Sequence, residues 1–380
     1  MNNKILIITA FYNYDYNIRI KYLEKYLEKN GYDCTILSSN FDHRKKNKYY
    51  IEKNSVIQLD VPEYKSNLSI KRIISHYIFS KKMYEYCMKV QPSTIYAITP
   101  PNFMFYFLKK FKKNHKVYLI YEIEDLWPES LPLSICMKKI LMPIMQIWSQ
   151  IRNRNINSAD YVVFECNLFK KYITNHSNMV GKTIYLSKDD SFKKSKIVKV
   201  DSVLRYIYLG SINNLIDIDF IIEILKCSSQ LVQTELHIIG EGEKLNQLLK
   251  LCNENNIKTI SYGIVYDEKR KADIFRQCHL ALNIMKPTVY VGATMKSLEY
   301  FHYGMPIINN IKGDTAEIIN MYECGINILS VGEIFKNVNF IVENMSGNIF
   351  QKMSNNSRNV YLKLFSPKSF EQSIGEVFGK

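Results

Sequence analysis

The stretch Ile5–Leu37, ILIITAFYNYDYNIRIKYLEKYLEKNGYDCTIL, sets the architecture of the chain. It begins with Ile5–Ala10, a short continuous apolar run of the kind found in strands buried on both faces of a parallel sheet. A segment with apolar residues at helical spacing follows and ends at Asn30-Gly31, a favourable helix C-cap. Tyr32–Leu37 then reads as a second strand. The stretch is therefore a strand–helix–strand unit, which predicts a parallel α/β sheet.

The same alternation continues along the chain. In the first half we expect helices at Ile70–Lys89 and Phe103–Lys113, and strands at Thr94–Thr99, Val117–Glu122 and Tyr161–Glu165. In the second half we expect strands at Tyr206–Leu209, Leu236–Ile239, Thr259–Tyr262, Leu280–Ile284 and Pro306–Asn309, with helices between them. The charged, aperiodic segment Ser187–Val200 separates the halves. These patterns predict two doubly wound α/β domains, in which ligands bind outside the carboxyl ends of the strands.

Length and composition agree with two domains. The chain has 380 residues, 47% of them apolar and 23% charged, enough for two cores of about 150–200 residues each. The formal net charge of +15 points to an anionic partner, which could be nucleotide phosphate, nucleic acid or an acidic membrane face. A general lysine-rich bias would explain the charge equally well. No nucleic-acid recognition motif accompanies it, so we expect no nucleic-acid partner.

The eight cysteines and seven histidines point to an intracellular protein without a structural metal. The cysteines lie scattered among apolar neighbours without a C-x-x-C pair, as expected for reduced thiols in the cytosol. The histidines never stand at ligand spacing from cysteines or carboxylates, so no metal site is expected. The first apolar run is too short for a signal peptide, and no uncharged stretch reaches the roughly 18 residues of a membrane span. We expect a cytoplasmic protein.

The most informative stretch for function is Val291–Asn310, VGATMKSLEYFHYGMPIINN. A loop at Gly292 leads into a helix that begins near Thr294, so free amide groups and the positive helix end face the loop. This is an anion site suited to a diphosphate. Lys296 in the first turn adds positive charge, and Glu299 one turn later places a carboxylate where it can accept both hydroxyls of a ribose.

The same stretch resembles the donor-site helix of the GT-B glycosyltransferases of family 4, in which a small-residue loop precedes a lysine, a glutamate and a Gly-x-Pro turn. The resemblance is closest to bacterial members that build capsule, exopolysaccharide and O-antigen units. It implies two Rossmann-like doubly wound domains facing a cleft and a retaining transfer from a nucleotide diphosphate sugar, most simply a UDP-sugar. It also implies an acceptor domain at 1–190, a donor domain at 201–360 and a C-terminal helix at 361–380 that packs back on the first domain.

Three further signals agree with this resemblance across the second half. The segment His237–Gly242 matches a strand that ends in Gly-acidic-Gly, Tyr262–Val265 matches the loop that contacts the nucleobase, and Gly210-Ser211 matches the loop beneath the donor phosphates. A polar segment after the next strand, Asn309–Thr315, is placed beside the donor. The resemblance therefore assigns donor binding to Gly210, Ser211, Gly240, Gly263, Ile264, Val265, Gly292, Ala293, Thr294, Lys296, Glu299, Asp314 and Thr315.

In the first half, Glu124–Ser130 (EDLWPES) follows a strand end and resembles the Asp-Leu-Trp-Pro-Glu-Ser motif of some of these polysaccharide enzymes. Asp125 and Glu129 would accept hydrogen bonds from acceptor hydroxyls there, and a capped turn with a buried tryptophan is the simpler alternative. Asn13 and Asn102, in loops at other strand ends, complete the expected acceptor site. Lys296 and Asp125 are the expected catalytic residues, and no cofactor or metal is expected.

Two departures from the family pattern leave a second hypothesis open. Val291 stands where many members have the first of two glutamates, and the loop Gly210–Asp217 lacks the basic pair that often follows the first donor-domain strand. The chain could therefore be a catalytically silent scaffold or activator of a polysaccharide assembly complex.

The segment 138–154, KKILMPIMQIWSQIRNR, mixes basic ends with large apolar residues. It could rest on an anionic bilayer at the inner face of the cell membrane and bring the site to an undecaprenyl-linked acceptor. An ordinary core helix explains the composition equally well. A glycan without a lipid is the other acceptor class that the resemblance implies.

Overall fold

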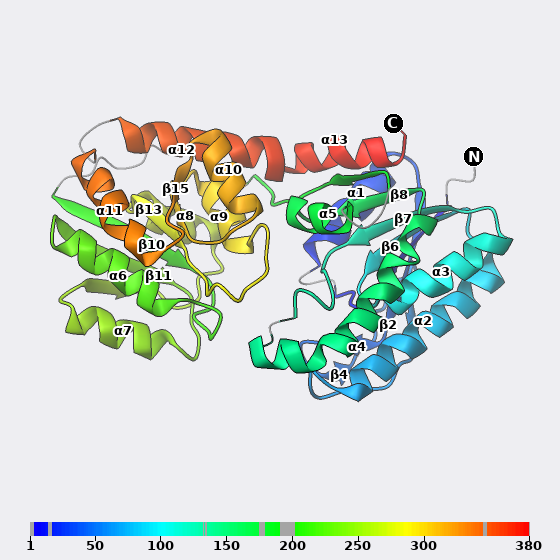
Figure 1. Cartoon of the computed structure of the whole chain (residues 1–380). Coiled ribbons are helices and arrows are strands. Elements are labelled where there is room, and N and C mark those ends of the chain that lie inside the picture. Colours follow the sequence, from blue (N-terminus) through cyan, green and yellow to red (C-terminus); the bar gives the residue numbers. More distant parts are fainter. Residues whose placement is uncertain are drawn as a thin grey trace. The chain divides into compact units, whose positions relative to one another are not determined.

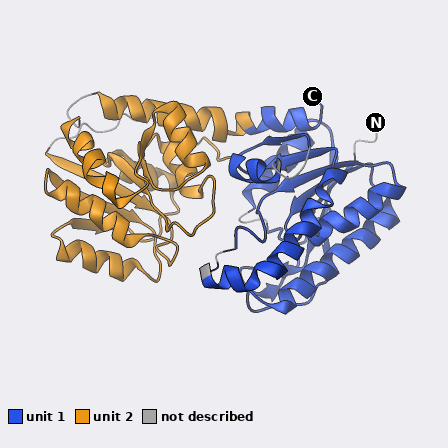
Figure 2. Cartoon of the chain, viewed as in Figure 1, with its two compact units in different colours: residues 1–186, 370–380 blue, residues 187–369 orange. Residues whose placement is uncertain are grey.

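The computed structural model describes residues 4–13, 17–131, 133, 135–174, 179–190, 202–344 and 348–379. It divides into two compact units, shown in different colours in Figure 2. Unit 1 contains residues 1–186 and 370–380, and unit 2 contains residues 187–369. Most of the expected linker Ser187–Val200 lies outside the described residues, and its first residues belong to unit 2.

Unit 1 is built on a seven-stranded sheet in which every pairing is parallel (Figure 1). The strand order reverses between β1 and β6, the central strand. From edge to edge the strands are β5 (Val56–Leu59), β2 (Asp33–Ser39), β1 (Lys4–Thr9), β6 (Thr94–Thr99), β7 (Tyr118–Ile123), β8 (Tyr161–Phe164) and β9 (Gly181–Thr183). A small hairpin of β3 (Phe41–Asp42) and β4 (Asn47–Lys48) stands beside the sheet.

The helices of unit 1 form where apolar residues recur every three or four positions. In α1 (Ile18–Lys29), Ile20, Leu23 and Leu27 are buried, while the lysines of the helix point outward. The other helices are α2 (Ile70–Val90), α3 (Phe103–Asn114), α4 (Ile135–Asn153) and α5 (Asn167–Thr174), with a 3-10 turn at Ile156–Ser158.

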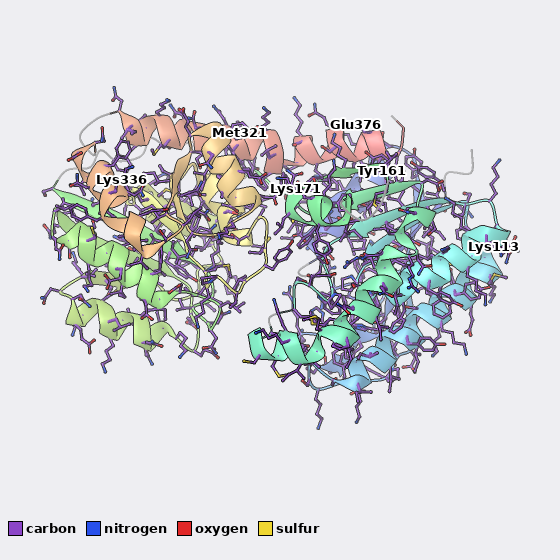
Figure 3. The ribbon with its side chains drawn as sticks, viewed as in Figure 1. Lys113, Tyr161, Lys171, Met321, Lys336 and Glu376 are labelled. Carbon is purple, nitrogen blue, oxygen red and sulfur yellow. The ribbon has the colours of Figure 1, made fainter. Side chains whose placement is uncertain are left out.

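The end of the chain completes the core of unit 1. Helix α13 (Pro367–Val377) begins in unit 2, and its later residues Phe370, Ile374 and Val377 are buried in the same cluster as Ile5 and Ile7. At the surface, Glu376 (labelled in Figure 3) pairs with Lys182 at 2.7 Å.

Unit 2 repeats the doubly wound pattern with a six-stranded parallel sheet. Its order reverses between β10 and β13, which is the switch point where such sheets bind ligands. The strands are β12 (Lys258–Ser261), β11 (Gln233–Ile239), β10 (Val203–Leu209), β13 (Leu280–Asn283), β14 (Ile307–Asn309) and β15 (Gly325–Asn327). The helices are α6 (Ile218–Ser229), α7 (Leu245–Glu254), α8 (Glu268–Arg276), α9 (Met295–Tyr303), α10 (Asp314–Tyr322), α11 (Ile334–Glu343) and α12 (Ile349–Val360), followed by a π-helical turn at Tyr361–Phe365.

The predicted class of two doubly wound α/β domains is confirmed. All eight cysteines are free thiols, as their scattered positions indicate. Within the part of the chain that the structure describes, no helix is both long and apolar enough to cross a bilayer.

Candidate functional site

The carboxyl end of the unit 2 sheet forms a cavity of about 420 Å³ at the switch point. Six of the expected donor residues line it, together with side chains from the strands β10 and β11 and the helices α8 and α9. The lining residues are Leu209, Gly210, Ser211, Ile239, Gly240, Glu241, Ile264, Val265, Tyr266, Lys271 and Glu299.

Bare backbone makes the floor of this cavity. Gly210 and Gly240 end strands β10 and β11, and both have positive φ angles, +114° and +141°. A Cβ atom on Gly240 would lie 2.1 Å from the carbonyl oxygen of Gly210, so only glycine fits there. The close approach leaves room for a ligand to lie directly against the main chain.

Lys296 on α9 passes directly over this glycine floor. A Cβ atom on Gly210 would lie 3.1 Å from the lysine Cε, and the ammonium donates a hydrogen bond to the Tyr208 hydroxyl at 2.5 Å. Among the described residues, no carboxylate lies within 4 Å of it. Burial lowers the pKa of Lys296 to about 7. The cavity therefore has beside it a desolvated cation without a counter-charge, which favours an anionic ligand.

The start of α9 is held rigidly by its capping box. The Thr294 hydroxyl accepts the Ser297 amide at 3.0 Å, and the Ser297 hydroxyl accepts the Thr294 amide at 3.0 Å. The amides of Met295 and Lys296 have no acceptor among the described residues, so the helix end keeps two donors for a ligand.

Four other expected donor residues lie behind this helix end and do not line the cavity. Gly292 is buried, and its carbonyl accepts hydrogen bonds from the amide and the hydroxyl of Thr315, both at 3.0 Å. Thr315 and Asp314, with exposed fractions of 0% and 1%, are buried at the start of α10. Ala293 belongs to the same loop. These residues hold the loop before α9 in place, because their polar groups are satisfied within the protein.

Glu299 lies in a network of charges that the sequence did not reveal. Its carboxylate pairs with Lys188 at 2.8 Å and lies 3.8 Å from Lys271. The Glu268 carboxylate also pairs with Lys188 and Lys271. Burial alone would raise the pKa of Glu268, but hydrogen bonds from Lys271, Tyr303 and Lys188 lower this pKa to about 2. Lys188 comes from the charged segment that was read as a linker, so nothing in its local pattern indicated this role.

The expected nucleobase loop follows β12. Gly263 has a φ of +65°. Its carbonyl accepts a hydrogen bond at 2.8 Å from the amide of Gly240, the residue that follows β11. After it, Val265 is buried, whereas Ile264 is 52% exposed and Tyr266 84% exposed. Two exposed side chains with apolar surfaces at the mouth of the cavity can cover a planar base.

In unit 1, the EDLWPES motif forms a turn after β7. The Asp125 carboxylate accepts hydrogen bonds from the indole N–H of Trp127 at 2.5 Å and from the Ser130 hydroxyl. Burial raises the pKa of Asp125, although these hydrogen bonds act in the opposite direction. The turn is therefore capped and its tryptophan is buried, which is the simpler alternative to an acceptor site given above. The Asp125 carboxylate can still accept a further hydrogen bond.

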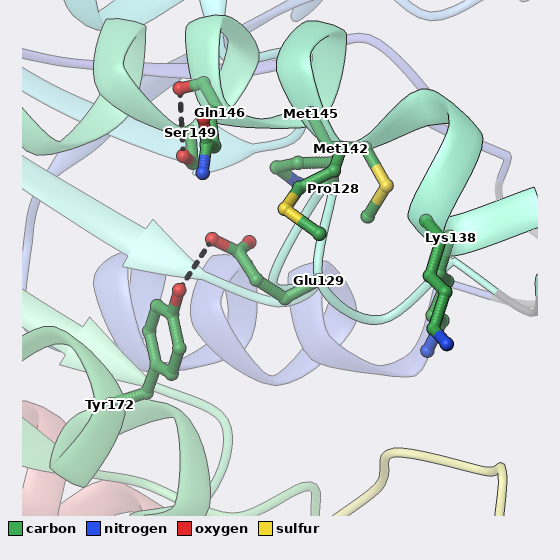
Figure 4. A pocket seen from close by; sticks show the side chains of 9 residues that line it. Pro128, Glu129, Lys138, Met142, Met145, Gln146, Ser149 and Tyr172 are labelled. Carbon is green, nitrogen blue, oxygen red and sulfur yellow. Dashed lines mark hydrogen bonds between the residues drawn. The ribbon is translucent and has the colours of Figure 1, made fainter. Parts of the chain in front are cut away.

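The other expected acceptor residues have partners within unit 1. Glu129 forms a two-pronged ion pair with Arg152, with both N–O distances at 2.8 Å, and also accepts the Tyr172 hydroxyl at 3.0 Å (Figure 4). Asn102 is 1% exposed and donates to the Trp127 carbonyl at 2.9 Å. Asn13 donates to Asp42 at 3.0 Å. These contacts give Glu129 and Asn102 a structural role in holding the turn.

Sequence reasoning missed a pair of carboxylates at the same sheet edge. Glu124 and Glu165 follow the paired residues Ile123 and Phe164 of β7 and β8, so they stand at adjacent strand ends. Burial and repulsion from Glu122 raise the pKa of Glu124 to about 7. The pKa of Glu165 is raised well above its usual range, by burial and by Glu124. Both carboxyl groups therefore take up a proton more readily than a glutamate in water.

The geometry of unit 2 defines a class of protein: a doubly wound domain that offers an anion site at its switch point, joined to a second doubly wound domain. No protein-family model and no curated protein sequence matches the chain. Solved structures match it over its whole length. The chain therefore has the GT-B fold, as the resemblance predicted. The sequence identities, given below, are low, so the likeness establishes the fold alone.

Three of these structures illustrate the match. Sucrose-phosphate synthase from Thermosynechococcus elongatus has a TM-score of 0.70 and 14% identity, covering 99% of this chain and 98% of that chain. The lipopolysaccharide outer core galactosyltransferase WaaB has a TM-score of 0.69 and 14% identity, covering 99% of both chains. HepE from Anabaena, solved in complex with UDP, has a TM-score of 0.70 and 13% identity, covering 99% of both chains.

Proposed function

We propose that the chain is a glycosyltransferase that transfers a sugar from a nucleotide diphosphate sugar bound by unit 2. The observation that carries the proposal is the uncompensated Lys296 ammonium beside a cavity with a glycine floor and two open amides at the start of α9. Uridine is the proposed base, since HepE, which shares the fold, was solved with UDP and with UDP-glucose.

Each part of the donor has a place in the cavity. The base lies at Gly263–Val265, the ribose hydroxyls donate to Glu299, and the diphosphate lies over Gly210-Ser211 against Lys296. The Lys188 contact does not prevent ribose binding, because a carboxylate offers about four acceptor positions. It holds the Glu299 side chain in one orientation before the ligand arrives, which lowers the entropy cost of binding.

Catalysis in this proposal is electrostatic. As the glycosidic bond loosens, negative charge grows on the leaving diphosphate, and Lys296 with the α9 amides stabilises it. The resemblance implies that the anomeric configuration is retained. A phosphate oxygen of the donor takes the proton of the acceptor hydroxyl, and Asp125 orients that hydroxyl.

The proposed acceptor is a glycan or an undecaprenyl-linked sugar in the synthesis of a bacterial surface polysaccharide. Helix α4 supports a membrane-bound acceptor, because Met137, Ile140, Ile144 and Ile147 form one exposed apolar stripe with exposed fractions of 43%, 71%, 57% and 64%. Lys138 and Lys139 stand beside this stripe and line a cavity of about 330 Å³ (Figure 4). An apolar stripe with adjacent lysines fits the inner face of an anionic membrane.

Calorimetry with UDP and with a panel of nucleotide sugars tests the donor assignment. We expect UDP to bind and one UDP-sugar to be hydrolysed or transferred, with turnover reduced mainly by Lys296→Met. If UDP does not bind, a catalytically silent scaffold becomes the better hypothesis; the loop Gly210–Asp217, which has no basic residue, and Val291 are the sequence features that motivate it.

A further inference from the structure

A second concentration of positive charge lies in unit 1, between the β3–β4 hairpin and the start of α2. Its central residue is Arg72, which is 7% exposed and has no carboxylate within 4 Å among the described residues. Its guanidinium lies 4.0 Å from the Trp127 ring centroid and donates a hydrogen bond to the Asn67 carbonyl at 2.8 Å. The buried Nε atom has no acceptor. A buried cation without a counter-charge is costly, and a bound anion removes that cost.

Lys46 brings a second cation to the same point. Its ammonium donates to the side-chain oxygen of Asn67, the residue whose carbonyl accepts from Arg72. The Tyr64 ring lies between them, 4.9 Å from the lysine nitrogen and 5.7 Å from the guanidinium carbon. Burial and repulsion from Arg72 lower the pKa of Lys46. Lys46 also has a left-handed φ of 60°, a strained conformation that a functional position can retain.

Buried polar atoms without partners surround these two cations. Both ring nitrogens of His76 have no hydrogen-bond partner, and the Tyr64 hydroxyl has none besides Arg72; each residue is 2% exposed. His76 lies one helical turn after Arg72, and its ring stacks on Trp127 at a centroid distance of 5.6 Å. Buried polar groups in folded proteins are normally satisfied, so atoms left open around one point indicate a missing ligand or ordered water.

The nearest acidic residue of the hairpin does not neutralise the cluster. Asp42 uses one carboxylate oxygen to accept the amides of Arg44 and Lys45, at 2.8 and 3.0 Å. Its other oxygen accepts the Asn13 amide group at 3.0 Å. Asp42 favours the charged form of Lys46, and Asp125 favours that of Arg72, but both act from beyond 4 Å, so neither cation has an ion-pair partner among the described residues.

We propose that Arg72 and Lys46, with Tyr64, bind a phosphate group of the acceptor. This inference rests on the proposed function and deepens it. Two cations that include a planar guanidinium fork match the charge and the paired oxygens of a phosphate or pyrophosphate. Arg72 lies on the ring of Trp127, whose N–H donates to Asp125, so the phosphate is held next to the residue that orients the acceptor hydroxyl. The acceptor class is accordingly a sugar joined to a phosphate or pyrophosphate, as in a polyprenyl-linked intermediate.

The test is isothermal titration of the full chain with inorganic pyrophosphate and with farnesyl diphosphate, in the presence of saturating UDP. A second series omits UDP and introduces each substitution into the Lys296→Met protein, in which the donor cavity lacks its cation. This series can be interpreted even if the protein does not bind UDP. We expect Arg72→Met and Lys46→Met each to weaken binding of both probes by about tenfold or more. The matched controls Lys71→Met and Lys45→Met remove an exposed charge from the same helix and the same hairpin. They should change the affinity for both probes less than about twofold.

Two results would overturn the proposal. One is pyrophosphate binding that is unchanged in Arg72→Met and Lys46→Met, which would mean that water alone satisfies the buried atoms. The other is glucuronate binding as tightly as pyrophosphate, which would exclude a phosphate-specific site. Melting temperatures show whether each variant is folded, and Lys46, at the surface of the hairpin, carries the test if Arg72→Met does not fold.

Discussion

Binding of UDP should take up a proton, because the donor cavity holds a cation that is half discharged at neutral pH. Burial lowers the pKa of Lys296 to about 7, against 10.5 for a lysine in water. A diphosphate beside the ammonium favours the charged form and brings its pKa back towards that of a free lysine. The terminal phosphate of UDP is itself ionised above a pKa of about 6, so above neutral pH the lysine accounts for the exchange.

The size of the effect follows from the two pKa values. In the free protein, about half of Lys296 is charged at pH 7, about a tenth at pH 8 and about a hundredth at pH 9. Binding should therefore take up about half a proton at pH 7 and about nine-tenths at pH 8, and UDP affinity should fall about fiftyfold between pH 7 and pH 9.

Calorimetry in two buffers of different ionisation enthalpy measures this uptake directly. Above neutral pH, Lys296→Met should bind UDP weakly and without proton uptake, whereas Lys296→Arg, which stays charged, should bind with little pH dependence. The reasoning is refuted if the wild-type protein takes up no proton at pH 8, or if the Met variant shows the same pH slope. Without ligand, the folded state holds fewer protons than the unfolded chain between about pH 7 and pH 10.5, so stability should rise with pH across that window.

Three further outcomes follow from the structure. Gly240→Ala should lower the free energy of unfolding by about 3–5 kcal/mol in urea denaturation, because the new Cβ would meet backbone 2.1 Å away, whereas Gly332→Ala, with open space around it, should be nearly neutral. Glu299→Gln should weaken UDP binding by about tenfold in calorimetry through loss of the ribose acceptor, and equal loss in the exposed Glu223→Gln would contradict this. Ile140→Ser should reduce sedimentation with anionic vesicles, because it removes an exposed apolar contact; unaltered sedimentation would remove the membrane contact.

The fold could be predicted because its signals are local. Continuous apolar runs such as Ile5–Ala10 identify strands buried on both faces, and glycine ends such as Asn30-Gly31 stop the intervening helices. Most boundaries shifted by one or two residues, as they do where helices and strands fray, whereas β10 and β11 begin three residues earlier than predicted. The short edge strands β5 and β9 were missed because an edge strand carries no long apolar run.

The candidate site was predictable only where backbone geometry decides it. Gly210, Gly240 and Lys296 lie together because strand ends and a helix start meet at a switch point, which the motif pattern encodes. The partners of Glu299 and Glu129 were not predictable, since Lys188 and Arg152 come from distant segments and pair through tertiary packing. The same holds for Arg72, which stands out because no carboxylate lies within 4 Å of its guanidinium among the residues that the structure describes.

The last residues of the chain belong to the core formed by the first ones, which has a consequence for synthesis. Until Phe370, Ile374 and Val377 have been synthesised, the sheet of unit 1 lacks them, so the apolar surface around Ile5 and Ile7 stays uncovered. Unit 2, by contrast, is complete once residue 369 has emerged. We therefore expect unit 2 to be able to fold before unit 1, whose core is completed by residues that are made after all of unit 2, an inversion of the usual vectorial order.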